Sequence, residues 1–310
     1  MTNLNKNYKK AFSLVEISIV ILIIGLLIAG ISKASDMIFD ANIASGRSLT
    51  KGAKVGRMPS LALWLELTLA ESIKDSERYK DSTVTLWRDI NPQSTSKFIF
   101  KNGGAPKYNP EGQNNMPAIG KFAAATDLFL PYSSEASAAV NANQSDQIFS
   151  SGAYATIFVV LKPAATVMNL ISFCPYAAAA TTTACAAGSE VSLGLNATGN
   201  LLFNFMSSTS ANVTLTSTIA YATNGLIIAS AVKDTAGQKL YVNGGDHVNV
   251  ANTYATTNVF SGAFRVGGTV STGVEIYEII VFSSALSTLD RQSVEAYLGK
   301  KYATPMSKAS

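Results

Sequence analysis

One stretch of the sequence is long and apolar enough to cross a lipid bilayer. Residues Phe12–Ile31 read FSLVEISIVILIIGLLIAGI and hold a single charge, Glu16. A helix of this length, rising about 1.5 Å per residue, spans about 30 Å, the thickness of a bilayer core. The residues before it are polar and carry Lys6, Lys9 and Lys10. Because basic residues orient their flank towards the cytoplasm, we expect everything after the apolar run to lie outside the cytoplasm.

Two ordinary explanations of such a run are a cleaved secretory signal and a plain membrane anchor. A signal peptide has an apolar core of about 7–15 residues before a small-residue cleavage site. The run here is longer, although Ser32–Asp36 offers a weak match to such a site. A plain anchor does not require Glu16, because an acid at mid-helix costs about 2.5–3.5 kcal/mol on insertion scales. The carboxylate therefore calls for a positive partner.

The segment Lys10–Glu16, KAFSLVE, resembles the processing site of type IV prepilins and type II secretion pseudopilins. In that family a peptidase cuts on the cytoplasmic side before a Phe and N-methylates the new terminus. The resemblance implies a cut between Ala11 and Phe12, with Phe12 methylated and the helix retained as anchor and filament core. It also implies that Glu16 pairs with the terminal amine of a neighbouring subunit and sets the axial register. One departure is Ala11, since the family usually has Gly before the cut.

The helical pattern continues beyond the apolar run but becomes amphipathic. Apolar residues recur there at spacings of three and four, which is the period of one helix face. They are Ile31, Ala34, Ile38, Ala41 and Ala44. We therefore expect one helix from about Phe12 to about Thr50, ending near Gly52, with Gly56 and Pro59 marking the break that follows.

The region from Leu61 to about Tyr302 consists of short apolar runs between turn signals. Hydrophobic residues make up 47% of the chain and charged residues 14%, which argues against disorder. We expect strands at 153–162, 189–195, 200–206, 226–232, 239–242 and 276–282. Short strands separated by turns predict a mainly β fold, an antiparallel β-sandwich or jelly roll, behind the N-terminal helix.

A short C-terminal helix is expected to follow the last strand. Ser287 is placed to cap it, with Asp290 as the third helical residue. The apolar face of this helix is expected to consist of Leu289, Val294, Tyr297 and Leu298.

Several segments of this region resemble laminin-G/concanavalin A-like domains of bacterial surface proteins. The matching segments are LALWLE at 61–66, LWRD at 86–89, APKYN at 105–109, MPAI at 116–119, KLYVNG at 239–244, IYEIIVFSSALS at 276–287 and AYLGKKY at 296–302. The resemblance implies a two-sheet jelly roll, concanavalin A-like, which often binds carbohydrate or protein. It also implies that Glu278 anchors a nearby turn through backbone hydrogen bonds. One departure is Glu66, where the family usually has an aspartate.

The sequence offers few residues for catalysis or for metal binding. Glycosidases need paired carboxylates, and Glu275 and Glu278, three apart in a strand, are expected on opposite faces, so we predict no enzyme. One His and two Cys leave little room for zinc, haem or iron–sulfur chemistry. We expect no cofactor, and a bound calcium ion is kept as an alternative.

The loop that could hold calcium contains the oxygen ligands Asn243, Asp246 and Asn249. A plain hairpin turn explains the same residues, because Asn-Gly is the strongest hairpin signal. Cys174 and Cys185 are expected to form a disulfide, since the compartment outside the cytoplasm permits one, with free thiols as the alternative.

These observations predict the following organisation: a leader at 1–11, a pilin-like helix at 12–50, a linker at 51–60, a β-sandwich at 61–303 and a tail at 304–310. The formal charge of +4 includes no basic cluster interleaved with aromatics, so we expect no nucleic acid partner. The expected partners are other pilin subunits, a prepilin peptidase, the inner membrane and a glycan or surface protein.

The predicted function is that of a minor pilin or pseudopilin that displays a lectin-like domain for adhesion. It would lie in the inner membrane before assembly, with its β-sandwich periplasmic or extracellular, and in a filament or on the cell surface afterwards. Two alternatives stay open, namely a type II secretion pseudopilin acting in protein export and a surface glycan hydrolase.

Overall fold

The computed structural model describes residues 13–94, 99–102, 106–120, 128–132, 154–163, 168–174, 191–206, 212–221, 225–251, 263–267 and 274–307. The chain divides into two compact units, with the division between Ala44 and Ser45.

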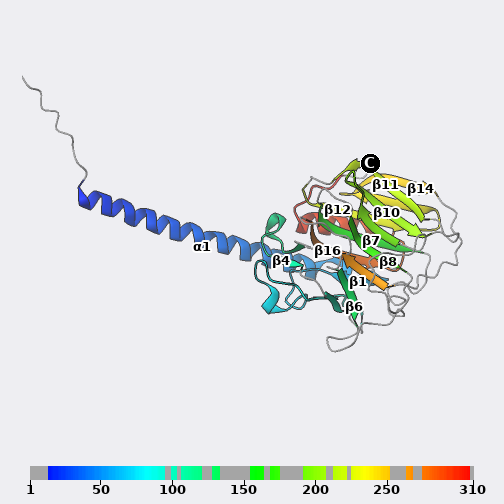
Figure 1. The fold of residues 1–310 in the computed structure, drawn as a ribbon, viewed down its shortest axis with the longest axis horizontal. Helices are drawn as coiled ribbons and strands as arrows, with labels where there is room; N and C mark the ends of the chain where they lie inside the picture. The colour runs from blue at the N-terminus through cyan, green and yellow to red at the C-terminus, as the bar shows by residue number, and fades with distance from the viewer. Residues whose placement is uncertain are drawn as a thin grey trace, which may run out of the picture. The chain divides into compact units, whose positions relative to one another are not determined.

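The first unit consists of most of the long helix α1 (Leu14–Gly52), drawn in blue in Figure 1. Its large aliphatic side chains are exposed from Leu14 to Ile31. This segment has a mean hydropathy of 2.9 and is, within the described residues, the one helix segment long and apolar enough to span a membrane. The expected helix is thus confirmed, and it runs on to Gly52 as the period predicted.

The second unit contains two antiparallel sheets of eight described strands each. In the first sheet, here sheet A, the strands follow the order β14 (Gly245–Ala251), β13 (Gly237–Val242), β12 (Ile227–Lys233), β7 (Ala155–Lys162), β16 (Glu275–Phe282), β5 (Ala118–Gly120) and β4 (Lys107–Asn109), and β1 (Leu61–Leu65) pairs with β16. Figure 1 shows β12, β7 and β16 side by side in this layer.

The second sheet, here sheet B, completes the β-sandwich. Its strand order is β11 (Asn212–Ala220), β10 (Asn200–Met206), β9 (Val191–Leu195), β8 (Met168–Cys174), β15 (Ala263–Gly267), β6 (Leu128–Tyr132), β3 (Ile99–Asn102) and β2 (Leu86–Arg88). The expected antiparallel β-sandwich is therefore confirmed.

The central strands β12, β7 and β16 of sheet A are buried on both faces, and strand β7 illustrates why. Ile157, Val159 and Leu161 point into the core that the two sheets share, with Leu193 and Phe203 of sheet B. The alternate residues Phe158 and Val160 lie in a second cluster on the other face. A strand covered on both faces reads as a continuous apolar run, which is the pattern of ATIFVVL at 155–161.

The second cluster is covered by the C-terminal helix α2 (Thr288–Lys301) and by the 3-10 helix η1 (Lys54–Arg57). Two further 3-10 helices are η2 (Asp75–Glu77) and η3 (Gln113–Asn115). The predicted cap of α2 is confirmed, since the Ser287 hydroxyl accepts a hydrogen bond from the Asp290 amide at 3.1 Å.

The predicted apolar face of α2 was wrong at one position. Leu289 is 78% exposed, whereas Val294 and Leu298 are fully buried. The buried face instead includes the charged residues Arg291 and Glu295, whose side chains pair at 2.5 Å. A charged pair whose two groups satisfy each other can lie on the buried face of a helix, so this face includes Arg291 and Glu295 and excludes Leu289.

Candidate functional site

The N-terminal end of α1 forms a capping box around Glu16. The Ser13 hydroxyl accepts a hydrogen bond from the Val15 amide at 3.3 Å, and the Glu16 carboxylate accepts one from the Ser13 amide at 2.8 Å. This reciprocal pairing satisfies two amides that a helix start otherwise leaves without partners. Glu16 therefore lies at the very start of the helix, where a negative charge is favoured. Ala11 and Phe12 lie outside the described residues, so the predicted cut stays a prediction.

A buried cluster of charged residues lies where β1, β16 and α2 meet. We call Glu66, Glu278 and Lys301 the buried triad. All three side chains are fully buried, and Lys301 Nζ lies 2.8 Å from Glu278 and 3.1 Å from Glu66. The triad carries two negative charges and one positive charge. Hydrogen bonds must therefore stabilise the negative charge that Lys301 does not balance.

From the described residues, Glu278 accepts four hydrogen bonds, all from side chains. Trp64 Nε1 and the Tyr297 hydroxyl donate to Oε1 at 2.7 and 2.9 Å. Lys301 Nζ and the Tyr302 hydroxyl donate to Oε2 at 2.8 and 2.9 Å. The backbone anchoring of a turn that the resemblance implied is therefore wrong for this residue, since side chains already occupy the lone pairs of both oxygens.

Glu66 is held mainly by the turn that follows β1. Its carboxylate accepts hydrogen bonds from the amides of Thr68 and Leu69, each at 2.7 Å, and from the Ser72 hydroxyl at 2.7 Å. Burial would raise the pKa of Glu66, but Lys301 and these hydrogen bonds outweigh it and lower that pKa. The Glu66 carboxylate thus bonds both to this turn and to Lys301, which lies 3.1 Å away.

Two opposing effects also act on the pKa of Lys301. Burial would lower its pKa, but the carboxylates of Glu278 and Glu66 outweigh burial and raise the pKa of Lys301. Burial, together with Glu278, also raises the pKa of Tyr302 well above its ordinary value. Glu66 and Lys301 are therefore both charged around neutral pH. Because the side chains of the triad are fully buried, the triad serves to hold the fold.

The last turns of α1 are bonded to this part of the sandwich. Thr50 Oγ1 lies 3.2 Å from the Tyr297 hydroxyl, which in turn donates to Glu278. Arg47 Nε donates to the Thr68 carbonyl at 2.7 Å, and Gly46 lies so close to Met116 that a Cβ there would meet its sulfur at 2.9 Å. The end of α1 is therefore connected, through Tyr297, to the buried triad.

A bulge in β16 corrects the expected placement of Glu275 and Glu278. The register against β7 shifts between Ile276 and Glu278. Tyr277 and Glu278 consequently both contact the cluster beneath α2, and the Tyr277 hydroxyl donates to Glu275 at 2.7 Å. Both carboxylates therefore lie on the same side of β16, contrary to the alternation expected for a regular strand, because a bulge adds one residue to that strand.

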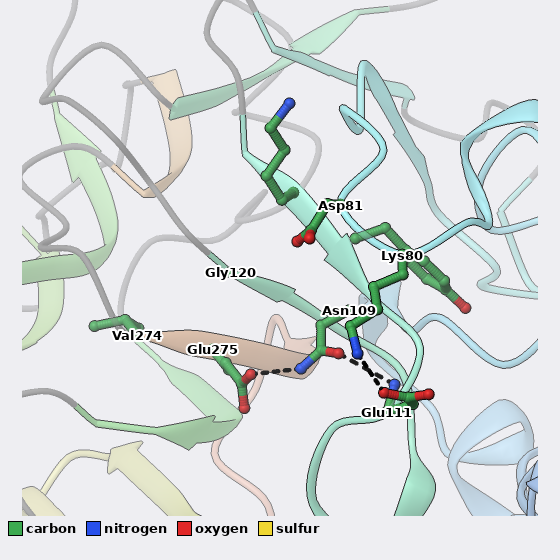
Figure 2. Close-up of a pocket in the computed structure, with 9 residues that line it drawn as sticks. Lys80, Asp81, Asn109, Glu111, Gly120, Val274 and Glu275 are labelled. Carbon is green, nitrogen blue, oxygen red and sulfur yellow. Dashed lines mark hydrogen bonds and ion pairs between the residues drawn. The ribbon is translucent and has the colours of Figure 1, made fainter.

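A pocket of about 360 Å³ opens at the β4 edge of sheet A (Figure 2). Its lining residues are Lys80, Asp81, Lys107, Tyr108, Asn109, Glu111, Gly120, Val274 and Glu275. Figure 2 shows Asn109 reaching Glu275 and Lys80 reaching Glu111, contacts of 2.7 and 2.6 Å. The sequence patterns did not point to this pocket, because its walls come from three segments far apart in the chain.

The candidate calcium loop forms the hairpin turn that was its alternative explanation. Asn243 and Gly244 connect β13 and β14 with φ values of 50° and 80°, as a two-residue turn of this kind requires. The Asn243 side-chain oxygen accepts a hydrogen bond from the Ile228 amide at 2.9 Å, so it serves the fold. The side chains of Asp246 and Asn249 lie outside the described residues. Within those residues, no group of three or more His, Cys, Asp or Glu could hold a metal ion.

The predicted disulfide stays a prediction. Strand β8 ends at Cys174, but Cys185 and the side chain of Cys174 lie outside the described residues.

Residues 6–32 match the family model described as the prokaryotic N-terminal methylation motif. The predicted prepilin-type N-terminal motif is therefore confirmed. The curated proteins contain no match to the sequence.

Solved structures with the same fold include several binding domains. The binding domain of botulinum neurotoxin serotype D/C matches with a TM-score of 0.51 and 12% identity, over 79% of this chain and 53% of that chain. The binding domain of Paraclostridial Mosquitocidal Protein 1 matches with a TM-score of 0.51 and 10% identity, over 78% and 52%. Botulinum neurotoxin type C, whose cell entry depends on interaction with two ganglioside molecules, matches with a TM-score of 0.50 and 11% identity, over 79% and 52%. The chain thus spans about half the length of these structures, and the likeness concerns the fold.

Proposed function

We propose that this chain is a subunit of a type IV pilus-type filament and displays a β-sandwich that binds a surface ligand. The observation that carries the proposal is the methylation motif at residues 6–32, directly continuous with an apolar helix long enough to span a membrane. A motif of this kind supports a structural subunit held in the membrane before assembly. The proposed role is therefore binding and not catalysis.

Processing would cut the chain between Ala11 and Phe12 and leave residues 12–50 as the assembly helix. The capping box supports this, because it starts the helix at Leu14, within two residues of the new terminus. The linker at 51–60, the sandwich at 61–303 and the tail at 304–310 would then lie outside the cytoplasm. The Glu16 carboxylate is placed one helical turn into the chain, where it could also meet the terminal amine of a neighbouring subunit.

The size of the sandwich favours a minor or tip subunit over the main filament subunit. The unit from Ser45 onward is far larger than the helix, so packing it at every subunit position would crowd the filament. Binding domains of the same fold occur in botulinum neurotoxins, and the type C toxin interacts with gangliosides. We infer a glycan or a surface protein as the ligand of this domain, and adhesion as its result.

The same N-terminal motif would serve a type II secretion pseudopilin. That alternative predicts export defects, and no loss of adhesion, when the gene is deleted. Adhesion and secretion assays on one deletion strain would distinguish the two.

Mass spectrometry of the mature N-terminus tests the proposal. We expect a chain that begins at an N-methylated Phe12. Ala11→Leu should block the cut, because the family accepts a small residue before it, whereas Ala34→Leu should leave the cut unchanged. An intact leader in the wild-type chain, or a cut after Ala34 that Ala34→Leu abolishes, would refute processing as a prepilin.

A further inference from the structure

A chain of hydrogen bonds orients the side chains of the pocket at the β4 edge before any ligand binds. The Tyr277 hydroxyl and Asn109 Nδ2 each donate to Glu275 at 2.7 Å, one to each carboxylate oxygen. Asn109 Oδ1 accepts from the Glu111 amide at 3.2 Å, and the Glu111 side chain holds Lys80 at 2.6 Å. A site whose side chains are already oriented loses less entropy when a ligand binds.

The pocket combines a buried floor with a polar rim. Tyr108, Gly120 and Val274 are buried, whereas Lys80, Asp81 and Glu111 are exposed. Its volume of about 360 Å³ lies at the small end of the range of about 300–1,000 Å³ that is usual for ligand pockets. A ligand of this size with several polar groups at its edge would fit the volume and the polar rim.

The rim offers hydrogen-bond acceptors and donors together. Asp81, Glu111 and Glu275 supply carboxylate acceptors, and Lys80 and Lys107 supply ammonium donors. A hydroxyl group can donate to the first kind and accept from the second, so a ligand with several hydroxyls can use both. Three carboxylates against two ammonium groups leave an excess of one negative charge, which disfavours an acidic ligand.

An extended peptide is a poorer fit for this edge. The outer side of β4 is already paired, because the Tyr108 amide donates to the Ser82 carbonyl and the Asp81 amide donates to the Tyr108 carbonyl, both at 2.9 Å. A peptide that added a strand here would have to displace these bonds.

We propose that this pocket binds one neutral sugar residue of a glycan. The inference rests on the proposed binding role of the sandwich and names its ligand class and its site. The hydroxyls of the sugar would meet Asp81, Lys80 and Lys107 at the rim of the pocket.

The test uses the full chain in a zwitterionic detergent without a sugar headgroup. The probes are neutral oligosaccharides ending in glucose, galactose or N-acetylhexosamine and the same oligosaccharides with sialic acid, on an array and then by calorimetry. Asp81→Asn and Lys80→Met should each weaken binding of a neutral oligosaccharide at least tenfold. Asp81 has a φ of 62°, a conformation in which Asn is also favourable, so this variant is expected to fold.

Matched controls are Asp75→Asn and Lys300→Met, which change exposed residues outside the pocket and should leave the affinity within twofold. Unchanged affinity in both pocket variants would overturn the pocket as the site and leave the binding role intact. Tighter binding of the sialylated forms would overturn the neutral ligand. If the wild-type chain is processed and enters filaments but binds none of the probes, the sugar inference fails while the filament proposal stands.

Discussion

The ammonium group of Lys301 lies 2.8 Å from the carboxylate of Glu278, and neither side chain has any exposed surface. Lys301 is the last residue of the C-terminal helix α2, and Glu278 lies in the central strand β16. Since Glu66 at the end of β1 joins them at 3.1 Å, the triad connects the first strand, the last strand and the last helix of the sandwich. Burying three charges is costly, so the dense hydrogen bonding around them is what makes the arrangement stable.

Lys301→Met should destabilise the protein strongly. The variant keeps the apolar stem but leaves Glu66 and Glu278 buried without a cation, which typically costs about 3–5 kcal/mol. The measurement is urea unfolding of the full chain in detergent micelles, followed by tryptophan fluorescence, because Trp64 and Trp87 are both buried beside the triad's strands. Lys300→Met is the control, since Lys300 is exposed and its loss should change stability by no more than about 0.5 kcal/mol. Equal effects of the two variants would contradict a stabilising triad.

The triad should also shape how stability depends on pH. The pKa of Glu66 is lowered from 4.5, so the unfolded chain binds a proton more readily than the folded chain. Its contribution is therefore present above about pH 4.5 and is lost as the pH falls through the lower folded value. The pKa of Lys301 is raised from 10.5, so its contribution is present below about pH 10.5 and is lost above the folded value.

Urea midpoints measured from pH 3 to pH 11 check this expectation. We expect a plateau across neutral pH with a fall at each end. Glu66→Gln should reduce the fall of the urea midpoint at acid pH. For this variant, the midpoint at each pH is compared with the variant's own midpoint at neutral pH. A wild-type midpoint that rises as the pH drops below 4 would contradict the sign of the Glu66 effect.

The fold could be predicted from sequence wherever the apolar residues of a strand themselves indicate that the strand is buried. Strand β10 at Asn200–Met206 and strand β7 at Ala155–Lys162 are apolar enough to be located from sequence, and the Asn243-Gly244 turn identifies its hairpin. The bulge in β16 was not predictable, because no residue type in EIYEIIVF signals it. That single bulge reversed the expected relation between Glu275 and Glu278.

The candidate site was less predictable than the fold. The processing segment is local in sequence and matches a known motif, so it could be identified from sequence. The buried triad and the pocket each join residues more than one hundred positions apart, such as Asn109 and Glu275. Contacts of this kind depend on the strand order, which apolar patterns do not specify.

Helix α2 offers a direct test of where pattern and structure disagree. Val294→Ala should cost about 1–3 kcal/mol, because it removes buried methyl groups and leaves a cavity. Leu289→Ala should be nearly neutral, since this side chain is 78% exposed, although the apolar pattern alone assigns both residues to one face. Thermal unfolding of both variants tests whether Leu289 belongs to the buried face. A loss for Leu289→Ala as large as that for Val294→Ala would favour the apolar face expected from sequence.

Gly112→Ala should disturb both stability and the pocket, because the glycine lies against the ring of Tyr277. A Cβ at this position would meet Tyr277 Cε1 at 2.8 Å and lie closer still to the Met116 carbonyl oxygen. The ring cannot retreat without losing its hydrogen bonds, since its hydroxyl accepts from the Gln113 amide at 2.9 Å and donates to Glu275. Overpacking of this kind costs about 1–3 kcal/mol in urea unfolding.

Gly225→Ala is the matched control for Gly112→Ala. A Cβ at Gly225 would meet Gln113 at no less than 3.5 Å, which is ordinary contact, so we expect a change within about 0.5 kcal/mol. If the pocket network needs Tyr277 in place, Gly112→Ala should also weaken binding of any sugar that the wild-type chain binds, whereas Gly225→Ala should not. A stable Gly112→Ala variant with unchanged affinity would mean that Tyr277 does not position Glu275, because the ring would then have moved without consequence for the pocket.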